Sequence, residues 1–185
     1  MLDQHQIAAA SRTLQDHWRQ GTKLDAIEAS LRPRDRAEGY AIQAAIEHGS
    51  AGGLFGWKIA ATSEAGQKHI NVDGPMAGRI LSETVIADGG TASMAGNEMR
   101  VGEPEFAFRM AADLPPRSQP YTLQQVLDAV GTLHPAIEIP DSRFRKSSAR
   151  VRRRSSPIMP ARICSFSARP RPRTGARSIW SRRSP

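Results

Sequence analysis

Apolar residues in the first fifty positions recur at helical spacing. Ile7, Leu14 and Trp18 fall on one face of a helix that would end at Gly21. A shorter helix should stop before Pro33, because the segment leading into a proline disfavours the helical conformation. The helices predicted in this part of the chain cover residues 7–20, 24–31 and 35–49.

Further along the chain the pattern changes to short apolar runs separated by glycine and asparagine turns, which is typical of β-strands. Thr62 or Ser63 can cap a short helix that reaches His69, and Thr122 starts another that reaches Val130. Strands are predicted over residues 54–60 and 134–139, with further short strands between residues 78 and 108. Helices followed by strands indicate an α+β fold, in which N-terminal helices lead into a β-rich mixed sheet.

Three glutamates interrupt the predicted strands. Glu103 and Glu105 would share one face of a strand, whereas Glu138 would point away from its neighbours Ile137 and Ile139. Buried carboxylates are costly without a counter-charge, and no Lys or Arg alternates with these three. A hard divalent cation such as Mg²⁺ or Mn²⁺ would satisfy them, because it prefers carboxylate oxygen. A solvent-exposed acidic strand face has the same spacing, so the spacing alone leaves both alternatives open.

Lys58 lies within the predicted strand 54–60, between Trp57 and Ile59. A lysine is a surface residue in most contexts. On a buried strand it would instead be desolvated, which predicts a lowered pKa and a role in proton transfer.

Residues 143–185 differ sharply in composition from the rest of the chain. They hold thirteen Arg, one Lys and no acid, a formal charge of +14, whereas residues 1–142 hold twelve Lys and Arg against eighteen acids, a formal charge of −6. Arg, Ser, Pro and Ala dominate this tail without an apolar period, which predicts disorder. We therefore expect a folded part over residues 1–144 and a basic tail over residues 145–185.

Two explanations account for the tail. A basic arm could bind nucleic acid or an acidic membrane surface, but this one has no folded reader motif and no aromatic platform for bases. GC-rich coding DNA that is read in the wrong frame also yields Arg, Pro, Ala and Ser. Because the change is abrupt and follows directly after Phe144, we favour a frameshift and expect no nucleic-acid partner.

Cysteine content and hydropathy bear on the compartment. The single cysteine, Cys164, lies in the tail, so no disulfide framework is expected and a reducing compartment suits the chain. The N-terminus lacks a basic region followed by an apolar stretch, and no apolar run approaches the roughly 18 residues of a membrane span. We expect a cytoplasmic protein that has no membrane partner.

Four ordered segments resemble one known family. They are Arg36-Ala-Glu-Gly-Tyr-Ala-Ile-Gln43, Gly56-Trp-Lys-Ile-Ala-Ala-Thr-Ser63, Gly102-Glu-Pro-Glu-Phe-Ala-Phe108 and Glu138-Ile-Pro-Asp-Ser-Arg-Phe144. Together they are similar to the 2-keto-4-pentenoate hydratase branch of the fumarylacetoacetate hydrolase superfamily. The resemblance runs from about residue 5 to Phe144 and implies a β-rich, rolled or barrel-like mixed sheet.

The resemblance also implies a site. In the family a Glu-x-Glu pair and a later acid hold a divalent metal, Mg²⁺ or Mn²⁺, and these match Glu103, Glu105 and Glu138 here. The family's active-site lysine matches Lys58, and Ser63, which closes the same motif, is a secondary candidate for binding substrate. Some members carry an acid at the position of Met76, so part of the substrate pocket differs in this chain.

The implied activity is a hydro-lyase reaction of aromatic meta-cleavage catabolism, in which water adds to a 2-hydroxy-2,4-dienoate and gives a 4-hydroxy-2-oxo acid. A 2-oxo-3-enoate decarboxylase of the 4-oxalocrotonate type has the same fold and metal and is the nearest alternative. Hydrolysis of an acylpyruvate is disfavoured, because Glu138 stands where hydrolase members usually have Asp. The family's catalytic domain is considerably longer, so we expect an incomplete, inactive form here and a homo-oligomer when the domain is complete.

Overall fold

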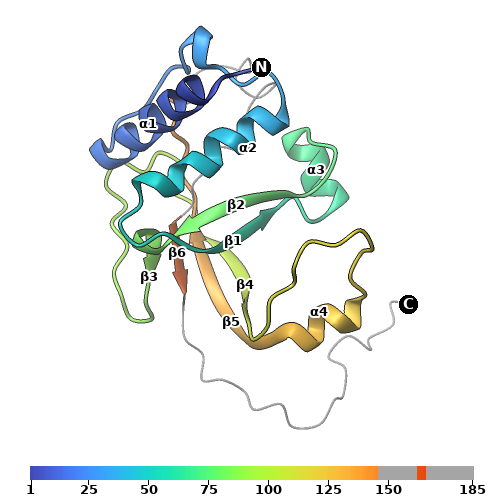
Figure 1. Cartoon of the computed structure of the whole chain (residues 1–185). Helices are drawn as coiled ribbons and strands as arrows, with labels where there is room; N and C mark the ends of the chain where they lie inside the picture. The colour runs from blue at the N-terminus through green and yellow to red at the C-terminus, as the bar shows by residue number, and fades with distance from the viewer. Residues whose placement is uncertain (146–161, 166–185) are drawn as a thin grey trace.

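Two β-sheets lie below a pair of N-terminal helices in the computed structural model, which describes residues 1–145 and 162–165 (Figure 1). The first sheet pairs β1 (Leu54–Ala60) with β2 (Met76–Leu81) in antiparallel orientation. The second sheet has the strand order β3-β6-β5-β4. Its strands are β3 (Val85–Ile86), β4 (Glu103–Met110), β5 (Val130–Ile139) and β6 (Arg162–Ser165). Helices followed by a mixed sheet confirm the predicted α+β class.

The first helix, α1 (Gln4–Gln20), has well-defined ends. The Asp3 carboxylate accepts a hydrogen bond from the backbone N–H of Gln6, and the Gln6 side chain accepts one from the backbone N–H of Asp3. This reciprocal pair satisfies donors that a helix start leaves unpaired. At the other end Gly21 adopts the left-handed conformation (φ 66°), which ends the helix where the sequence predicts.

The second helix, α2 (Arg36–Ala44), starts at Asp35 as predicted and continues as the 3₁₀ helix η2 (Ala45–Gly49). Its apolar side chains pack against those of α1 and form the buried core. The core residues are Ala10, Leu14, Ile27 and Ile42, with Leu2, Ile7, Leu24, Leu31 and Phe144 packed around them. The core therefore lies between the helices and holds the segment that follows β5.

The helix predicted over residues 24–31 is wrong except for its last turn, the 3₁₀ helix η1 (Ala29–Leu31). Leu24 is paired with a distant segment instead. Its backbone N–H donates to the carbonyl of Arg143 at 2.8 Å, and its carbonyl accepts from the N–H of Arg145 at 2.8 Å. These long-range backbone bonds replace the local helical ones, which propensity alone does not foresee.

The short strands predicted between residues 78 and 108 form only at the two ends of that range, and residues 87–102 contain no strand.

The two later helices start where the sequence predicts. α3 (Glu64–Ile70) starts at Ser63 and α4 (Leu123–Ala129) starts at Thr122, and both hydroxyls accept a backbone hydrogen bond. Residues 82–84 form a further 3₁₀ turn, η3 (Ser82–Thr84).

The sequence predicts no strand after Phe144, yet β6 lies there. It pairs parallel with β3 and antiparallel with β5, so it joins these two strands into one sheet. A gap between two strands offers backbone donors and acceptors to any extended segment, and composition does not reveal this. The rest of the tail, for which disorder is predicted, lies outside the described residues.

Among the helices of the described part, none is both long and apolar enough to cross a membrane.

Candidate metal centre

Strand register brings the three predicted glutamates together. On the antiparallel pair β4–β5, Glu103 lies directly opposite Glu138, and Glu105 is two residues further along the same face of β4. One carboxylate oxygen from each side chain lies within 4.8 Å of the other two. The pattern of two acids on one strand and one on its neighbour therefore becomes a cluster, which we call the glutamate cluster (Glu103, Glu105 and Glu138).

The cluster is buried at one end and open at the other. The Glu138 side chain is 4% exposed, whereas Glu103 and Glu105 are 45% and 41% exposed. Burial raises the pKa of Glu138 above its ordinary value; the Lys58 ammonium opposes this effect, and the other two carboxylates add to it. A solvent-exposed acidic face is thus a fair description of the outer pair but not of Glu138.

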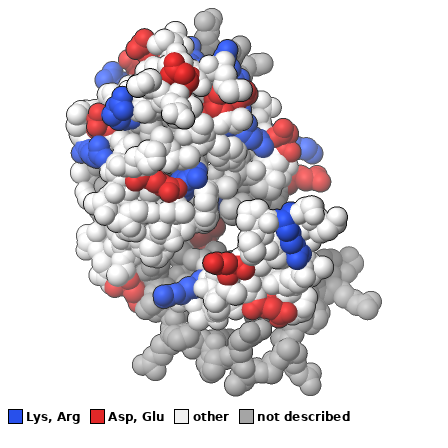
Figure 2. All heavy atoms as spheres, viewed as in Figure 1, with Lys and Arg blue, Asp and Glu red and all other residues white. Residues whose placement is uncertain are grey.

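The counter-charge comes from the other sheet. Lys58 projects from β1, and its Nζ lies 3.5 Å from Glu105 Oε1, 4.0 Å from Glu103 Oε2 and in direct hydrogen-bond contact with Glu138 Oε2. Sequence inspection finds no basic residue alternating with the acids, because the partner comes from a strand 47 residues away from Glu105. In Figure 2 the surface is hollowed between the upper body and the smaller lobe, and acidic atoms lie within the hollow.

The predicted lowering of the Lys58 pKa is wrong for this structure. Burial does lower the pKa of the ammonium, but the hydrogen bond to Glu138 and the charges of all three carboxylates together outweigh it, so the pKa is raised. Moreover, β1 is not buried on both faces. Trp57 and Ile59 are half-exposed on the side away from Lys58, and the Arg79 guanidinium stacks 4.6 Å from the Trp57 ring centroid.

Ser63, the secondary candidate, has a local structural partner. Its Oγ accepts a hydrogen bond from the backbone N–H of Gly66 at 3.1 Å and so caps α3. The side chain is exposed, and its role in binding substrate stays a prediction. Met76 begins β2 opposite Ala60, at the end of the strand that carries Lys58.

A second set of contacts, which the sequence did not reveal, fixes the chain just after Glu138. Lys23 donates to the Asp141 carboxylate and to the Ser142 carbonyl, while Asn97 Nδ2 donates to the Pro140 carbonyl at 3.1 Å. The backbone N–H of Glu98 also donates to Asp141. Asp141, in the segment Glu138-Ile-Pro-Asp141, is the residue in the sequence that could have indicated these contacts, because a partly buried acid after a strand needs a hydrogen-bonding or charged partner.

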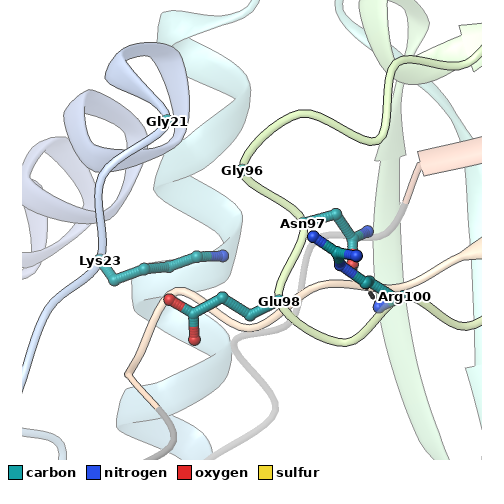
Figure 3. Close-up of a pocket in the computed structure, with 6 residues that line it drawn as sticks. All are labelled: Gly21, Lys23, Gly96, Asn97, Glu98 and Arg100. Atoms are coloured by element: carbon teal, nitrogen blue, oxygen red, sulfur yellow. Dashed lines mark hydrogen bonds between the residues drawn. The ribbon is translucent and has the colours of Figure 1, made fainter.

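Three of these residues, Lys23, Asn97 and Glu98, border a pocket of about 480 Å³. Figure 3 shows the Lys23 and Glu98 side chains extending toward one another, Lys23 from the segment that follows α1 and Glu98 from the loop before β4. The lining residues are Gly21, Lys23, Gly96, Asn97, Glu98 and Arg100. None of the glutamate cluster lines this pocket, so Glu98 belongs to a separate feature.

The donor set of the cluster suits a hard divalent cation. Three carboxylates and one ammonium carry a formal charge of −2, and all the candidate ligand atoms are carboxylate oxygens. A cation in contact lowers the cost of keeping a buried acid such as Glu138 in its charged form, and both an ammonium and a metal ion meet that need. The residues present therefore fit Mg²⁺ or a similar ion.

Comparison with known proteins gives a consistent result. No protein-family model matches the chain. A curated "2-keto-4-pentenoate hydratase" from Burkholderia vietnamiensis is 27% identical over 148 residues, which are 78% of this chain and 56% of the hydratase. The chain thus spans little more than half the length of this relative.

Two solved structures share the fold. Both are of 4-oxalocrotonate decarboxylase from Pseudomonas putida G7, one complexed with magnesium and adipate and the other with calcium and acetate. Their TM-scores are 0.74 and 0.70 at 18% and 19% identity, and each match covers 89% of this chain and 64% or 63% of the decarboxylase. The resemblance to the hydratase branch is confirmed, and the fold is that of the two decarboxylase structures.

Proposed function

We propose that this chain carries the metal-binding half of a hydratase that adds water to a 2-hydroxy-2,4-dienoate and forms a 4-hydroxy-2-oxo acid. The observation that carries the proposal is the convergence of Lys58 from one sheet on Glu103, Glu105 and Glu138 of the other. The name of the curated relative supports the reaction, and the magnesium and calcium in the solved decarboxylase structures support a divalent cation.

In this proposal the three glutamates would hold the cation. The bound Mg²⁺ or Mn²⁺ supplies Lewis-acid chemistry toward the carboxylate and adjacent oxygen of a 2-oxo acid. The protein contributes a fixed ligand set, because Glu103 and Glu138 are held opposite each other by the β4–β5 hydrogen bonds. Glu103 and Glu105, both partly exposed, form the open side from which a small 2-oxo or 2-hydroxydienoic acid would enter.

Lys58 is the proton carrier in the proposal. Since its pKa is raised, Nζ is protonated at neutral pH and enters the reaction as an acid. It would donate a proton to a substrate carbon and regain one as the substrate hydroxyl becomes a carbonyl, so protons balance over the tautomerisation. The side chain is only 18% exposed, which limits exchange of that proton with bulk water.

A 2-oxo-3-enoate decarboxylase is the second candidate, and the solved structures of 4-oxalocrotonate decarboxylase favour it. The same lysine would then protonate the carbon that loses CO₂. The products distinguish the two reactions. With Mg²⁺ present, 2-hydroxypenta-2,4-dienoate should be converted to a 4-hydroxy-2-oxo acid without CO₂ release, as measured by dienol absorbance and chromatography. Release of CO₂ from a 2-oxo-3-enedioate with no hydration of the dienoate would favour the decarboxylase.

We also propose that residues 145–185 are read out of frame, so that turnover requires the restored sequence. The absence of acids and the thirteen arginines after Ser142 support this, because ordinary domains contain about a quarter charged residues of both signs. Shifting the frame by one nucleotide near codon 144 should give mixed charge, alternating apolar strands and glycine turns. Early stop codons in both other frames, or hydratase turnover by the 185-residue chain, would contradict the proposal.

A further inference from the structure

We propose that Lys58 is the resident cation of the glutamate cluster: its ammonium takes the position that a metal ion would occupy, so Lys58 sets the affinity and charge preference of the site. This inference rests on the proposed metal-binding function. It differs from a proton-transfer role, because it concerns what balances the charge of the three carboxylates without a metal ion and what an entering ion must displace.

The contacts of the ammonium are the first evidence. Lys58 Nζ meets Glu103 Oε2, Glu105 Oε1 and Glu138 Oε2, at 4.0 Å, 3.5 Å and hydrogen-bond contact respectively. One oxygen from each of the same three carboxylates lies within 4.8 Å of the other two. A metal ion bound about 2.0–2.6 Å from such oxygens would lie among them. The ammonium and the ion therefore compete for one position.

The strand that carries Lys58 lets its side chain leave without disturbing the sheets. Lys58 lies opposite Gly78 on β2, so its cross-strand neighbour has no side chain to compete for space. β1 is hydrogen-bonded to β2 and belongs to a different sheet from β4 and β5. Displacement would change rotamers along a flexible four-carbon stem, and the backbone register of both sheets would stay as it is.

The charge of the Lys58 ammonium should determine which ions the glutamate cluster prefers. With Lys58 in contact the cluster carries a formal charge of −2, which matches a divalent ion. Without the ammonium the formal charge is −3, which favours cations in general and trivalent ions most, because the attraction scales with the product of the charges. Neutralising Lys58 should therefore tighten metal binding, with a larger gain for a trivalent ion than for a divalent one.

The experiment compares Lys58→Met, which keeps the stem without the charge, with Lys58→Arg, which keeps a cation. Mn²⁺ binding is measured by calorimetry and Tb³⁺ binding by luminescence, both on the 185-residue chain and without substrate. For Lys58→Met we expect Kd for Mn²⁺ to fall at least about 10-fold and Kd for Tb³⁺ to fall further. Lys58→Arg should bind both ions within about 3-fold of the parent chain.

Three other outcomes would contradict the role proposed for Lys58, and they can be told apart. Equal or weaker Mn²⁺ binding by Lys58→Met, with Glu105→Gln losing binding, refutes the role of Lys58 and leaves the metal site standing. A parallel gain in Lys58→Arg would show that side-chain shape matters and charge does not. Failure of every form to bind either ion would remove the metal site and this inference together. Circular dichroism verifies folding, and Lys58→Gln replaces Lys58→Met if the methionine variant does not fold.

Discussion

Glu138 and Lys58 form an ion pair in which each side chain stabilises the charge of the other. A carboxylate that is 4% exposed has lost most of its hydration, and the Lys58 ammonium in contact with it replaces part of that loss. Removing one member of such a pair leaves an uncompensated buried charge, which is more damaging than the net contribution of the pair suggests. Burial lowers the pKa of Lys58 and raises that of Glu138, and the contact between them acts in the opposite direction on each; the contact and the neighbouring carboxylates prevail at Lys58, burial prevails at Glu138, and both pKa values are raised.

Lys58 should be required for turnover in the proposed reaction. Lys58→Met should lower kcat of the active, correctly framed form by at least about 100-fold, because general acid–base catalysis contributes on this scale. Substrate binding should survive, because the glutamate cluster is unchanged. Steady-state kinetics with Mg²⁺ checks this. Turnover equal to that of the parent protein would show that another group moves the proton.

The residue types of the site could be predicted from the sequence, and their arrangement in part. An i, i+2 pair places Glu103 and Glu105 on one face whatever the fold. The opposition of Glu103 and Glu138 depends on strand register, which the sequence does not specify. The contact with Lys58 requires the relative placement of two sheets. Because the sequence does not show this contact, it predicts a lowered pKa for Lys58, whereas the pKa is raised.

At the scale of elements, local signals succeed where the chain supplies its own hydrogen bonds. The end of α1 at Gly21 and the starts of α2, α3 and α4 depend on residues at or next to the cap, so the sequence places them. The start of α1 lies three residues before the predicted one, because apolar spacing alone does not reveal the Asp3 cap. The segment around Leu24 and strand β6 depend on backbone partners far away in the chain. Local sequence patterns do not show such distant partners, so they predict neither the extended conformation at Leu24 nor strand β6.

Glu38 gives a prediction for the helical layer. Its buried carboxylate accepts hydrogen bonds from the backbone N–H of Leu2 and of Arg34, each at 2.8 Å, and from the Arg34 guanidinium at 3.0 Å. The Arg34 backbone N–H is the main cause that lowers the pKa of Glu38; burial opposes it, and the Leu2 N–H adds to the lowering. The carboxylate therefore stabilises the fold above the ordinary glutamate pKa, about 4.3, and this stabilisation is lost as the pH falls through the lowered folded-state value.

Glu38→Gln should accordingly lower the free energy of unfolding at pH 7 and make it less dependent on pH below about 5. Urea denaturation at a series of pH values measures both effects. Glu64→Gln is the matched control, because Glu64 is an exposed glutamate in the first turn of α3. An equal loss of stability in both variants at every pH would contradict the role given to Glu38.

At the scale of the whole molecule, apolar side chains remain exposed on the sheet. Phe106 is 74% exposed and Phe108 and Met110 are also exposed, all on β4, which is an edge strand among the described residues. Trp57 and Ile59 add exposed apolar surface on the other sheet. Faces and edges of this kind favour self-association.

We therefore predict that the chain self-associates as its concentration rises, and that Phe106→Ser with Phe108→Ser shifts it toward the monomer. Size-exclusion chromatography with light scattering, from about micromolar concentrations upward, provides the measurement. Ile70→Ser changes an exposed apolar residue on α3 and serves as the control. A strictly monomeric parent chain would show that this surface is tolerated in water.

A calorimetric titration of Mn²⁺ into two matched variants decides whether the glutamate cluster is a divalent-cation site. Glu105→Gln removes one charge from the cluster, whereas Glu98→Gln makes the same change beside the separate pocket of Figure 3, where the Glu98 backbone makes the bond to Asp141. We predict that Glu105→Gln weakens Mn²⁺ binding by at least about 100-fold and that Glu98→Gln leaves it unchanged. Unchanged affinity in Glu105→Gln, or equal losses in both variants, would show that the glutamate cluster is not the binding site of the ion.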